Sequence, residues 1–515
     1  MDNFRKTLKK LSSKILLKSQ NPRIKERQNI KKFKLPLQGI KANTSLHSNK
    51  QLVPRDPYFF QIGFDFGTSS SKAIIRDINT NIAWIYTYSN NITNNTILIP
   101  SIVIYQNGYF AQYKNIDTLY PKNGLYHLKI AAQKIANGIT EDQVFSEYKK
   151  IAESSLPYPY TYFIELTCIY FLSSSFSDIL MNITQKFPNY GQNQDDQIAI
   201  NMAMPVSDIS DNNVRILFER ILNISWKISC KFKPFPKRIS ILRLNEMVVE
   251  CQQNAIENSN DSLCHVYPEV SANMQAFIRS PASSPNDSTI YFFNDTGAGT
   301  VDQCVFTYTR DNKKLNYFSD GVFLRGSSQI ETIACGDNIN KDNLEFWRKK
   351  KEQGENSSTL TRAKYKITEE LNIDTQKTLQ KTLHCLRSGP GVTKMDTLKY
   401  NIRFIFSGGG HTKFPYHYAV VEAYKDFMKT KTDPLITSMA IPQDLLIKGH
   451  ELWIKRLYVA YGLSFLFEEL AENSFPTDNK IDDKIKQNKT IASEECSCRG
   501  YNKNCVRCYG TGIIQ

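Results

Sequence analysis

The chain has 515 residues, too many for one small hydrophobic core, so we expect a large two-lobed domain or several domains. Hydrophobic residues make up 41% and charged residues 22%, which is a globular composition, and the lack of a run of 18 apolar residues argues against a membrane-spanning helix. No secretory signal is recognisable, and eleven cysteines are too few for a disulfide scaffold. We therefore expect reduced thiols and a cytoplasmic location.

The positive charge is concentrated near the N-terminus. The chain has a net charge of +15, and residues 1–57 hold 15 basic and 3 acidic residues, against 50 and 47 in the remainder. The nearly neutral remainder gives no reason to expect nucleic-acid binding by the whole protein. Residues 1–57 read as a mostly disordered leader. Apolar side chains at helical spacing in residues 3–18 also allow a basic amphipathic helix that touches an anionic membrane, nucleic acid or acidic protein, or a transit peptide.

Apolar strands and turns begin at Tyr58, and helices follow later in the chain. The predicted strands are Phe59–Phe66, Ala73–Ile78, Ile82–Tyr88, Ile290–Phe293, Gln303–Tyr308 and Ile402–Phe406. The predicted helices are Tyr416–Met428 and Leu457–Glu469, together with a polar helical region over residues 340–385.

Two segments combine a strand end, an aspartate and a turn of small residues. The first is Asp65–Lys72, DFGTSSSK, and the second is Asp295–Asp302, DTGAGTVD. Glycines let the backbone bend and approach a ligand, and the turn N–H groups can then converge on phosphate. Carboxylates beside a polyphosphate repel it unless a cation lies between them, so Asp65, Asp295 and Asp302 indicate Mg²⁺ held largely through water. Either turn alone could be an ordinary hairpin, and neither is a Walker A loop or a dinucleotide fingerprint, but two copies favour phosphate binding.

With these turns in view, the sequence resembles the actin-like ATPase superfamily, and within it the nucleotide-binding domain of the seventy-kilodalton heat-shock (DnaK-type) chaperones. The two aspartate turns are similar to that family's two phosphate loops. Further similar segments follow in the family's order: Ile99–Val103, Tyr120–Lys129, Ala203–Pro205, Asp211–Leu222, Tyr267–Ala272, Arg362–Thr368, Ser407–Pro415 and Val459–Gly462. They run from about residue 60 to 470, which is most of the chain.

The resemblance implies an organisation for the whole chain. The implied fold is α/β, a two-lobed actin-like ATPase with two duplicated mixed-sheet subdomains and helical insertions, over residues 58–472. Lobe I would cover about 58–285 and 455–472, and lobe II about 286–454. A linker would occupy residues 473–493, and a zinc knuckle would occupy residues 494–515.

The resemblance also implies ATP or ADP with Mg²⁺ as the ligand, and a role for each site residue. Lys129 would stabilise charge on the γ-phosphoryl group, Asp302 would orient the attacking water, and Glu269 and Asp295 complete the implied catalytic set. Water-mediated metal contacts fall to Asp65, Glu269 and Asp295. The implied phosphate-binding residues are Asp65, Gly67, Thr68, Ser69, Ser70, Lys72, Gly297, Gly299 and Thr300. The implied adenosine-binding residues are Lys364, Tyr365, Thr368, Gly409, Gly410 and Lys413.

Departures from the family pattern shape the functional expectation. Lys413 and Tyr365 stand where the family usually has arginines, although an aromatic ring can cover a base by stacking. After about residue 470 there is no room for the family's peptide-binding domain and lid. We therefore expect a Mg²⁺-dependent switch that binds ATP, hydrolyses it slowly and acts on a protein partner or cochaperone. The alternatives are a nucleotide-dependent scaffold with little hydrolysis and an actin-like filament-forming ATPase; a sugar or acetate kinase fits less well.

Four cysteines lie in the last twenty residues, and they predict a zinc site. Cys496, Cys498, Cys505 and Cys508 supply the four thiolates of a tetrahedral Zn²⁺ site, bound within one chain or shared between chains. The CxxCxGxG half resembles one repeat of the DnaJ-type zinc domain, whereas the first half is CxC. Free or redox-active cysteines are the alternative. We expect the other seven cysteines to be buried small apolar residues.

Overall fold

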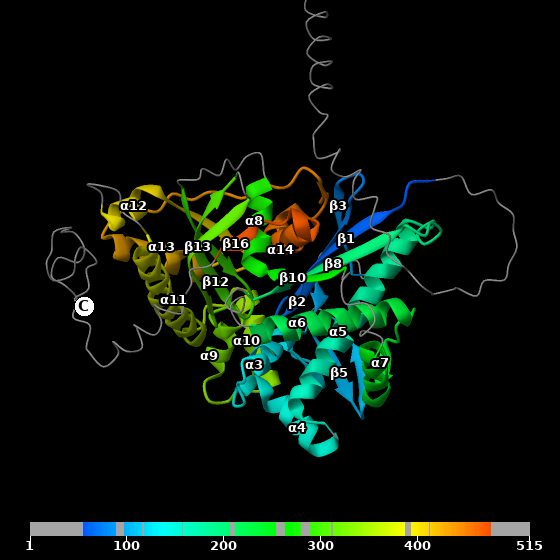
Figure 1. Cartoon of the computed structure of the whole chain (residues 1–515). Coiled ribbons are helices and arrows are strands. Elements are labelled where there is room, and N and C mark those ends of the chain that lie inside the picture. Colours follow the sequence, from blue (N-terminus) through cyan, green and yellow to red (C-terminus); the bar gives the residue numbers. More distant parts are fainter. Residues whose placement is uncertain are drawn as a thin grey trace, which may run out of the picture. The chain divides into compact units, whose positions relative to one another are not determined.

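The structure is a computed structural model that describes residues 55–88, 97–115, 118–156, 158–205, 212–253, 263–279, 289–310, 313–386, 393–410 and 413–474 (Figure 1). The chain divides into two units between Arg55 and Asp56, and all the helices and strands that the structure describes belong to the second unit. Nearly all of the predicted leader, most of the predicted linker and the cysteine cluster lie outside the described residues. The described part is mixed α/β, which confirms the predicted class.

The first sheet is built on an antiparallel meander with parallel strands beside it. Its strands are β1 (Phe59–Asp65), β2 (Ser70–Asp77), β3 (Ile82–Ile85), β4 (Ile99–Pro100), β8 (Gln197–Met204), β10 (Cys264–Pro268) and β15 (Leu445–Leu446). The order is β10-β8-β1-β2-β3-β15, with β4 beside β2. β8 runs parallel to β1, and β10 runs parallel to β8. β1 is apolar and buried almost throughout because it lies in the middle of the sheet.

Helices cover both faces of this first sheet. The side chains of Phe60, Ile62 and Phe64 share a core with α5 (Tyr160–Lys186) and α6 (Asn212–Lys231). On the other face, α14 (Ile454–Leu463) packs over β1 and β2. A small sheet of β7 (Gly124–Leu125), β5 (Val103–Gln106), β6 (Tyr109–Gln112) and β9 (Arg238–Ser240) joins the same core, as do α3 (Leu128–Ala136), α4 (Ser146–Ser155) and α7 (Ile241–Gln253). We call this assembly the first part.

The second sheet repeats the central arrangement of the first. Its strands are β11 (Ile290–Thr296), β12 (Val301–Thr309), β13 (Lys314–Phe323), β14 (Ile402–Ser407) and β16 (Glu472–Ser474). β11, β12 and β13 form an antiparallel meander, and β14 lies parallel beside β11, as β8 lies beside β1. Its helices are α9 (Gln329–Cys335), α10 (Lys341–Glu352), α11 (Ser358–Cys385), α12 (Lys394–Asn401) and α13 (Tyr416–Met428). We call this assembly the second part.

Two helices connect the parts and pack against each other. α8 (Glu269–Arg279) follows β10 of the first sheet and precedes β11 of the second. α14 follows β15 of the first sheet and precedes β16 of the second. Their backbones are in contact, because a Cβ atom on Gly462 would collide with the carbonyl oxygen of Ala272. A side chain at Gly462 would therefore force the two helices apart.

Several expectations need correction. β15 lies in the residues expected for lobe II, but it extends the first sheet. β16 spans the end of the residues expected for lobe I and the start of the expected linker, but it pairs with β13 of the second sheet. Strands of two or three residues are placed by backbone pairing at a sheet edge, which leaves no hydrophobic pattern in the sequence. The last predicted helix also starts earlier, at Ile454, and ends at Leu463. Residues Phe467–Glu469 instead form a separate 3₁₀ turn.

Two predictions about apolar residues also need correction. Cys168, Cys251, Cys264 and Cys304 are buried as expected, but three other cysteines are only partly buried. α5 is long and apolar enough to cross a membrane by length and composition, with a mean hydropathy of 1.3 over its most apolar 18-residue window. Counting uninterrupted apolar residues missed it because serine and threonine interrupt the run. Since 94% of that window is buried inside the protein, packing in the core accounts for the apolar composition.

Candidate functional site

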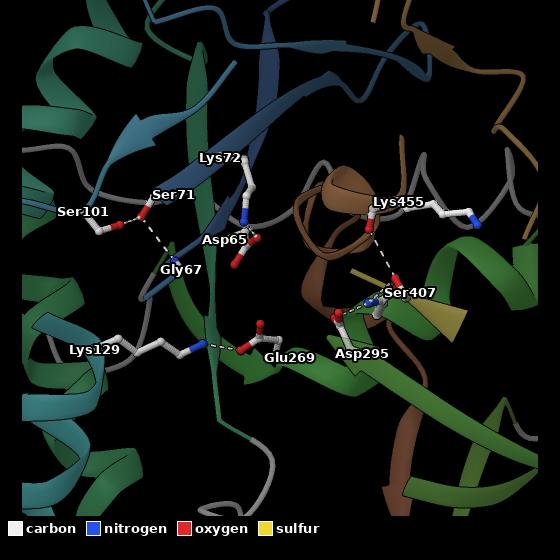
Figure 2. Close-up of polar contacts among 11 residues, drawn as sticks. Asp65, Gly67, Ser71, Lys72, Ser101, Lys129, Glu269, Asp295, Ser407 and Lys455 are labelled. Atoms are coloured by element: carbon white, nitrogen blue, oxygen red, sulfur yellow. Dashed lines mark hydrogen bonds and ion pairs between the residues drawn. The ribbon is translucent and has the colours of Figure 1, made fainter. Parts of the chain in front are cut away.

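The first aspartate turn is braced by hydrogen bonds on both sides. Asp65 ends β1 and pairs in register with Lys72 of β2, whose Nζ lies 2.8 Å from Asp65 Oδ2. The N–H of Gly67 donates to Ser71 Oγ at 3.3 Å, and Ser71 Oγ is hydrogen-bonded to Ser101 Oγ at 2.9 Å (Figure 2). The turn is therefore held from β2 and from the segment after β4. Of the remaining predicted phosphate-binding residues in this segment, Thr68 and Ser69 lie in the turn and Ser70 begins β2.

The second aspartate turn is held in a similar way. The N–H of Gly297 donates to the carbonyl of Thr300 at 2.9 Å, which closes the turn between β11 and β12. Asp295 and Asp302 face each other in register across these two strands. The N–H of Gly326, just before α9, donates to the carbonyl of Gly299 at 3.2 Å. The turn is thus anchored to the second part.

The two turns are in contact. A Cβ atom on Gly299 would lie 2.8 Å from Thr68 Cγ2 and 2.9 Å from Thr68 Oγ1. Between them lies a cavity of about 10 Å³ whose lining includes Thr68, Lys129, Glu269, Thr300 and Asp302. This volume suits about one water molecule. The sequence prediction that the two turns share one site thus agrees with the geometry, but the turns are closed on each other.

Lys129 is a buried partner of Glu269 rather than a surface lysine. It is the second residue of α3, and its Nζ forms an ion pair with Glu269, the first residue of α8 (Figure 2). Burial lowers the pKa of Lys129, but the carboxylates of Glu269, Asp65 and Asp302 outweigh this effect and raise it overall. Lys129 is therefore charged at neutral pH and faces several carboxylates at once.

The other two carboxylates are strongly perturbed. Burial raises the pKa of Asp295 to about 7, helped by repulsion from Glu269 and Asp65 and opposed by Lys72 and a hydrogen bond from Asn273. Burial, followed by repulsion from Glu269, also raises the pKa of Asp302 well above its usual range. These mutual effects mean that carboxylates from β1, α8, β11 and β12 converge on one space, as Figure 2 shows for three of them.

The site has features suited to a hydrated cation. Among the residues that the structure describes, Asp65 Oδ1 and Asp302 Oδ1 are buried side-chain oxygens without a hydrogen-bond partner. In the described part of the chain, four carboxylates lie beside two basic side chains, Lys72 and Lys129, so negative charge is in excess when all four are ionised. Within the described ranges no three Asp, Glu, His or Cys side chains come close enough to hold a metal ion directly. Water-mediated contact is the arrangement that these residues can offer.

A third turn, at the end of β14, closes over Asp295. Gly408 has φ 82°, in the left-handed region, and a Cβ atom there would collide with Asp295 Oδ1. Asn273 of α8 ties the two segments together: its Nδ2 donates to Asp295 Oδ2 at 2.8 Å and to Ser407 Oγ at 3.1 Å. Ser407 Oγ in turn donates to the carbonyl of Lys455 at 3.3 Å (Figure 2). Sequence reasoning missed Asn273, although it directly follows the Tyr267–Ala272 segment, because its partners Asp295 and Ser407 lie far away in the sequence.

Arg456 was also missed. It lies over the predicted adenosine turn, since a Cβ atom on Gly409 would be 2.8 Å from Arg456 Cζ and 2.9 Å from Nη2. Its guanidinium also lies 4.8 Å from the ring centroid of Trp453. Gly410 packs against Thr296, so this turn contacts the second aspartate turn as well. Gly408 and Gly410 thus lie beside Asp295 and Thr296, and the guanidinium group of Arg456 covers Gly409.

The predicted adenosine-binding residues of α11 are less closely tied to the carboxylates. Tyr365 is 57% exposed, and its ring centroid lies 5.8 Å from that of Phe414, four residues beyond Gly410. Lys413 is exposed beside it. Lys364 and Thr368 lie one helical turn apart, and Thr368 Oγ1 donates to the Lys364 carbonyl at 3.0 Å. The structure therefore brings Tyr365 near the third turn and leaves its face open. The four predicted zinc ligands lie outside the described residues.

No protein-family model matches the chain, and no curated protein sequence matches it at a significant level. Function is therefore inferred from the fold and from this site.

Proposed function

We propose that the protein is a Mg²⁺-dependent nucleotide switch of the DnaK-like type, which binds ATP, hydrolyses it slowly and acts on a protein partner. One observation carries this proposal: two aspartate-ended turns, from two different sheets, meet at a buried cluster of carboxylates. The contact of Gly299 with Thr68 and the effect of Asp65 on the pKa of Asp295 both support a single shared site. A triphosphate placed there would contact both parts of the molecule.

The strand topology supports an actin-like fold with two lobes. In each sheet an antiparallel meander of three strands has a parallel strand beside its first member. In each sheet the aspartate turn joins the first two strands of that meander. The same turn at the same place in two copies of one arrangement is expected of a duplicated nucleotide-binding fold.

The charges support phosphoryl chemistry by positioning rather than by a covalent intermediate. Mg²⁺, when bound, would neutralise charge on the phosphates. Asp65, Glu269 and Asp295 would hold it through water, using oxygens such as Asp65 Oδ1 that lack a protein partner among the described residues. Lys129 would stabilise negative charge on the terminal phosphate. Asp302 would accept a hydrogen bond from the attacking water.

The closed cavity supports a switch. The cavity between the turns suits about one water molecule, and Gly299 is in contact with Thr68, so the closed site has no room for a triphosphate. Nucleotide binding therefore requires the two aspartate turns to separate. Because the turns belong to different sheets, separation moves the two parts relative to each other, and a bound nucleotide would set how far they reclose.

A scaffold with little hydrolysis is favoured by one specific observation. Lys129 and Glu269, both in the proposed catalytic set, form an ion pair with each other. A bound triphosphate has to compete with Glu269 for Lys129. If it fails to do so, the protein would bind nucleotide without efficient turnover.

ATP turnover by purified protein with Mg²⁺ tests the proposal. We expect slow release of inorganic phosphate, and we expect Asp65→Asn and Asp295→Asn to abolish it while circular dichroism stays unchanged. Asp337→Asn is the matched control, since Asp337 is an exposed aspartate in the second part. Nucleotide binding without phosphate release would select the scaffold. Turnover that both site variants retain would refute the assignment.

A further inference from the structure

Lys341 of α10, in the second part, forms hydrogen bonds with a turn of the first part. Lys341 begins α10, and its Nζ donates to the carbonyl oxygens of Lys122 at 3.0 Å and Gly124 at 3.2 Å. The same Nζ lies 3.3 Å from Glu147 Oε2 of α4. An ammonium group has three protons, so these three acceptors can use all of them. The turn at residues 119–124 is thereby held from the other part of the molecule.

A second contact, one helical turn further along α10, holds the start of the same segment. The N–H of Leu119 donates to Glu345 Oε2 at 3.2 Å. Burial raises the pKa of Glu345, but the hydrogen bond and charge of Arg348 lower it overall, so the carboxylate stays ionised as an acceptor. Tyr120 follows Leu119 and is buried, and Glu331 of α9 and Glu345 both contribute to the rise in its pKa. The whole segment is docked against α9 and α10.

The turn at residues 119–124, which Lys341 binds, leads directly to Lys129. Gly124 is the first residue of β7, which is followed by His127 in the left-handed conformation with φ 58° and then by α3, with Lys129 as its second residue. Burial lowers the pKa of His127 to about 4, so its ring is neutral at physiological pH. Lys129 lies only five positions after Gly124, whose carbonyl Lys341 binds. Movement of the turn therefore moves Lys129.

The contact between α10 and residues 119–124 also affects how the site opens. α8 and α14 join the two parts covalently and remain connected in any open form. The contact between α10 and residues 119–124 is noncovalent and joins the same two parts, so it has to yield when the two aspartate turns separate. The hydrogen bonds from Lys341 to Lys122, which is exposed, and to Gly124, which is buried, are charge-assisted, and such bonds are stronger than those between neutral groups.

We propose that Lys341 is a positioning residue: it clamps the turn that leads into α3, the helix of Lys129, and holds the site shut, so that release of this clamp limits ligand entry and exit. The clamp itself follows from the contacts of Lys341, and its effect on ligand exchange rests on the proposed nucleotide binding.

Hydrogen exchange of the full chain without nucleotide tests the clamp directly. We expect Lys341→Ala to speed amide exchange in residues 119–130 and in the first aspartate turn by about tenfold or more, as expected when a charge-assisted hydrogen bond is lost. Lys341→Arg should restore most of the protection, because guanidinium can still donate to both carbonyls. Lys350→Ala is the matched control, because that lysine lies on the same helix and pairs with Glu355 instead.

Release of a fluorescent ATP analogue in Mg²⁺ then tests ligand exchange. We expect release from Lys341→Ala to be about ten- to a hundredfold faster than from wild type, and release from Lys350→Ala to match wild type. Unchanged exchange in residues 119–130 would overturn the clamp. Faster hydrogen exchange with unchanged release of the ATP analogue would overturn the role of Lys341 in limiting ligand exit. If wild type binds no nucleotide, the proposed function fails, and hydrogen exchange alone still decides whether Lys341 holds the site shut.

Discussion

Asp295 should make the stability of the protein depend on pH in a direction that can be measured. Burial raises its pKa from 3.8 to about 7, with repulsion from Glu269 and Asp65 adding to the effect. We expect Asp295→Asn to stabilise the folded protein above pH 7, because an amide removes the cost of ionising this buried carboxyl group. The oxygen of the new amide can still accept the hydrogen bond that Asn273 donates to Asp295.

The sign and size of the effect follow from the two pKa values. Below pH 3.8 the carboxyl group is protonated in both the folded and the unfolded chain, so its ionisation does not affect stability. As the pH rises from 3.8 to about 7, the unfolded chain loses the proton while the folded chain keeps it, and stability falls. At about 1.4 kcal/mol per pKa unit, the full loss above pH 7 is at most about 4 kcal/mol. For about 400 folded residues this corresponds to roughly 4–5 °C in Tm.

Thermal unfolding of wild type, Asp295→Asn and Asp337→Asn between pH 5 and pH 8.5, without divalent cations, checks this prediction. The gap between Asp295→Asn and wild type should widen as the pH rises and level off above pH 7, while the exposed Asp337→Asn control follows wild type. Adding Mg²⁺ at pH 8 should stabilise wild type more than Asp295→Asn. A gap that is constant, or that narrows as the pH rises, would refute a carboxyl group with a raised pKa at this position.

Lys129→Met leaves Glu269 without its partner and should destabilise the protein by about 3 kcal/mol in chemical denaturation, whereas adding Glu269→Gln should recover most of that loss without restoring turnover. Gly299→Ala places a methyl group against the first aspartate turn and should lower stability by about 1–3 kcal/mol, measured in the same way. Tyr365→Ala should weaken ATP binding by about 1–3 kcal/mol in calorimetry but leave tripolyphosphate binding unchanged, if its exposed ring stacks on the base. The full-length protein should contain one Zn²⁺ per cysteine cluster by elemental analysis, and it should lose this metal when the last two cysteines are replaced by serine.

Parts of the fold with a strong local pattern could be predicted from the sequence. β1, β11 and β14 are mostly apolar strands, and burial of most of their side chains favours that pattern. β1 ends at Asp65, β11 ends just after Asp295 and β14 ends at Ser407, and a turn that contains glycine follows each of them. α13 matches its predicted bounds at both ends, because its apolar side chains recur at helical spacing and a proline precedes it. The contact of Gly299 with Thr68 agrees with the expectation that the two aspartate turns share a site.

Residues that depend on long-range packing could not be predicted. Asn273 follows the Tyr267–Ala272 segment, but its hydrogen bond to Asp295 depends on how α8 packs against the second sheet, which no local pattern in the sequence shows. Arg456 covers Gly409 only because α14 crosses the end of β14. Lys341 is one of many lysines in a polar segment, and its two carbonyl acceptors lie more than two hundred residues earlier in the chain. In each case the partner is fixed by tertiary structure rather than by local sequence.

The ion pairs within the site make cation binding depend on the protonation of the remaining carboxyl groups. Lys72 is paired with Asp65, and Lys129 is paired with Glu269, so each lysine already has a carboxylate partner. The excess negative charge then rests on Asp295 and Asp302, whose pKa values are raised. A proton or a divalent cation can relieve this charge, and the two therefore compete. Cation binding should release protons, and its affinity should rise as the pH passes through about 7, since only the ionised form of Asp295 attracts the cation.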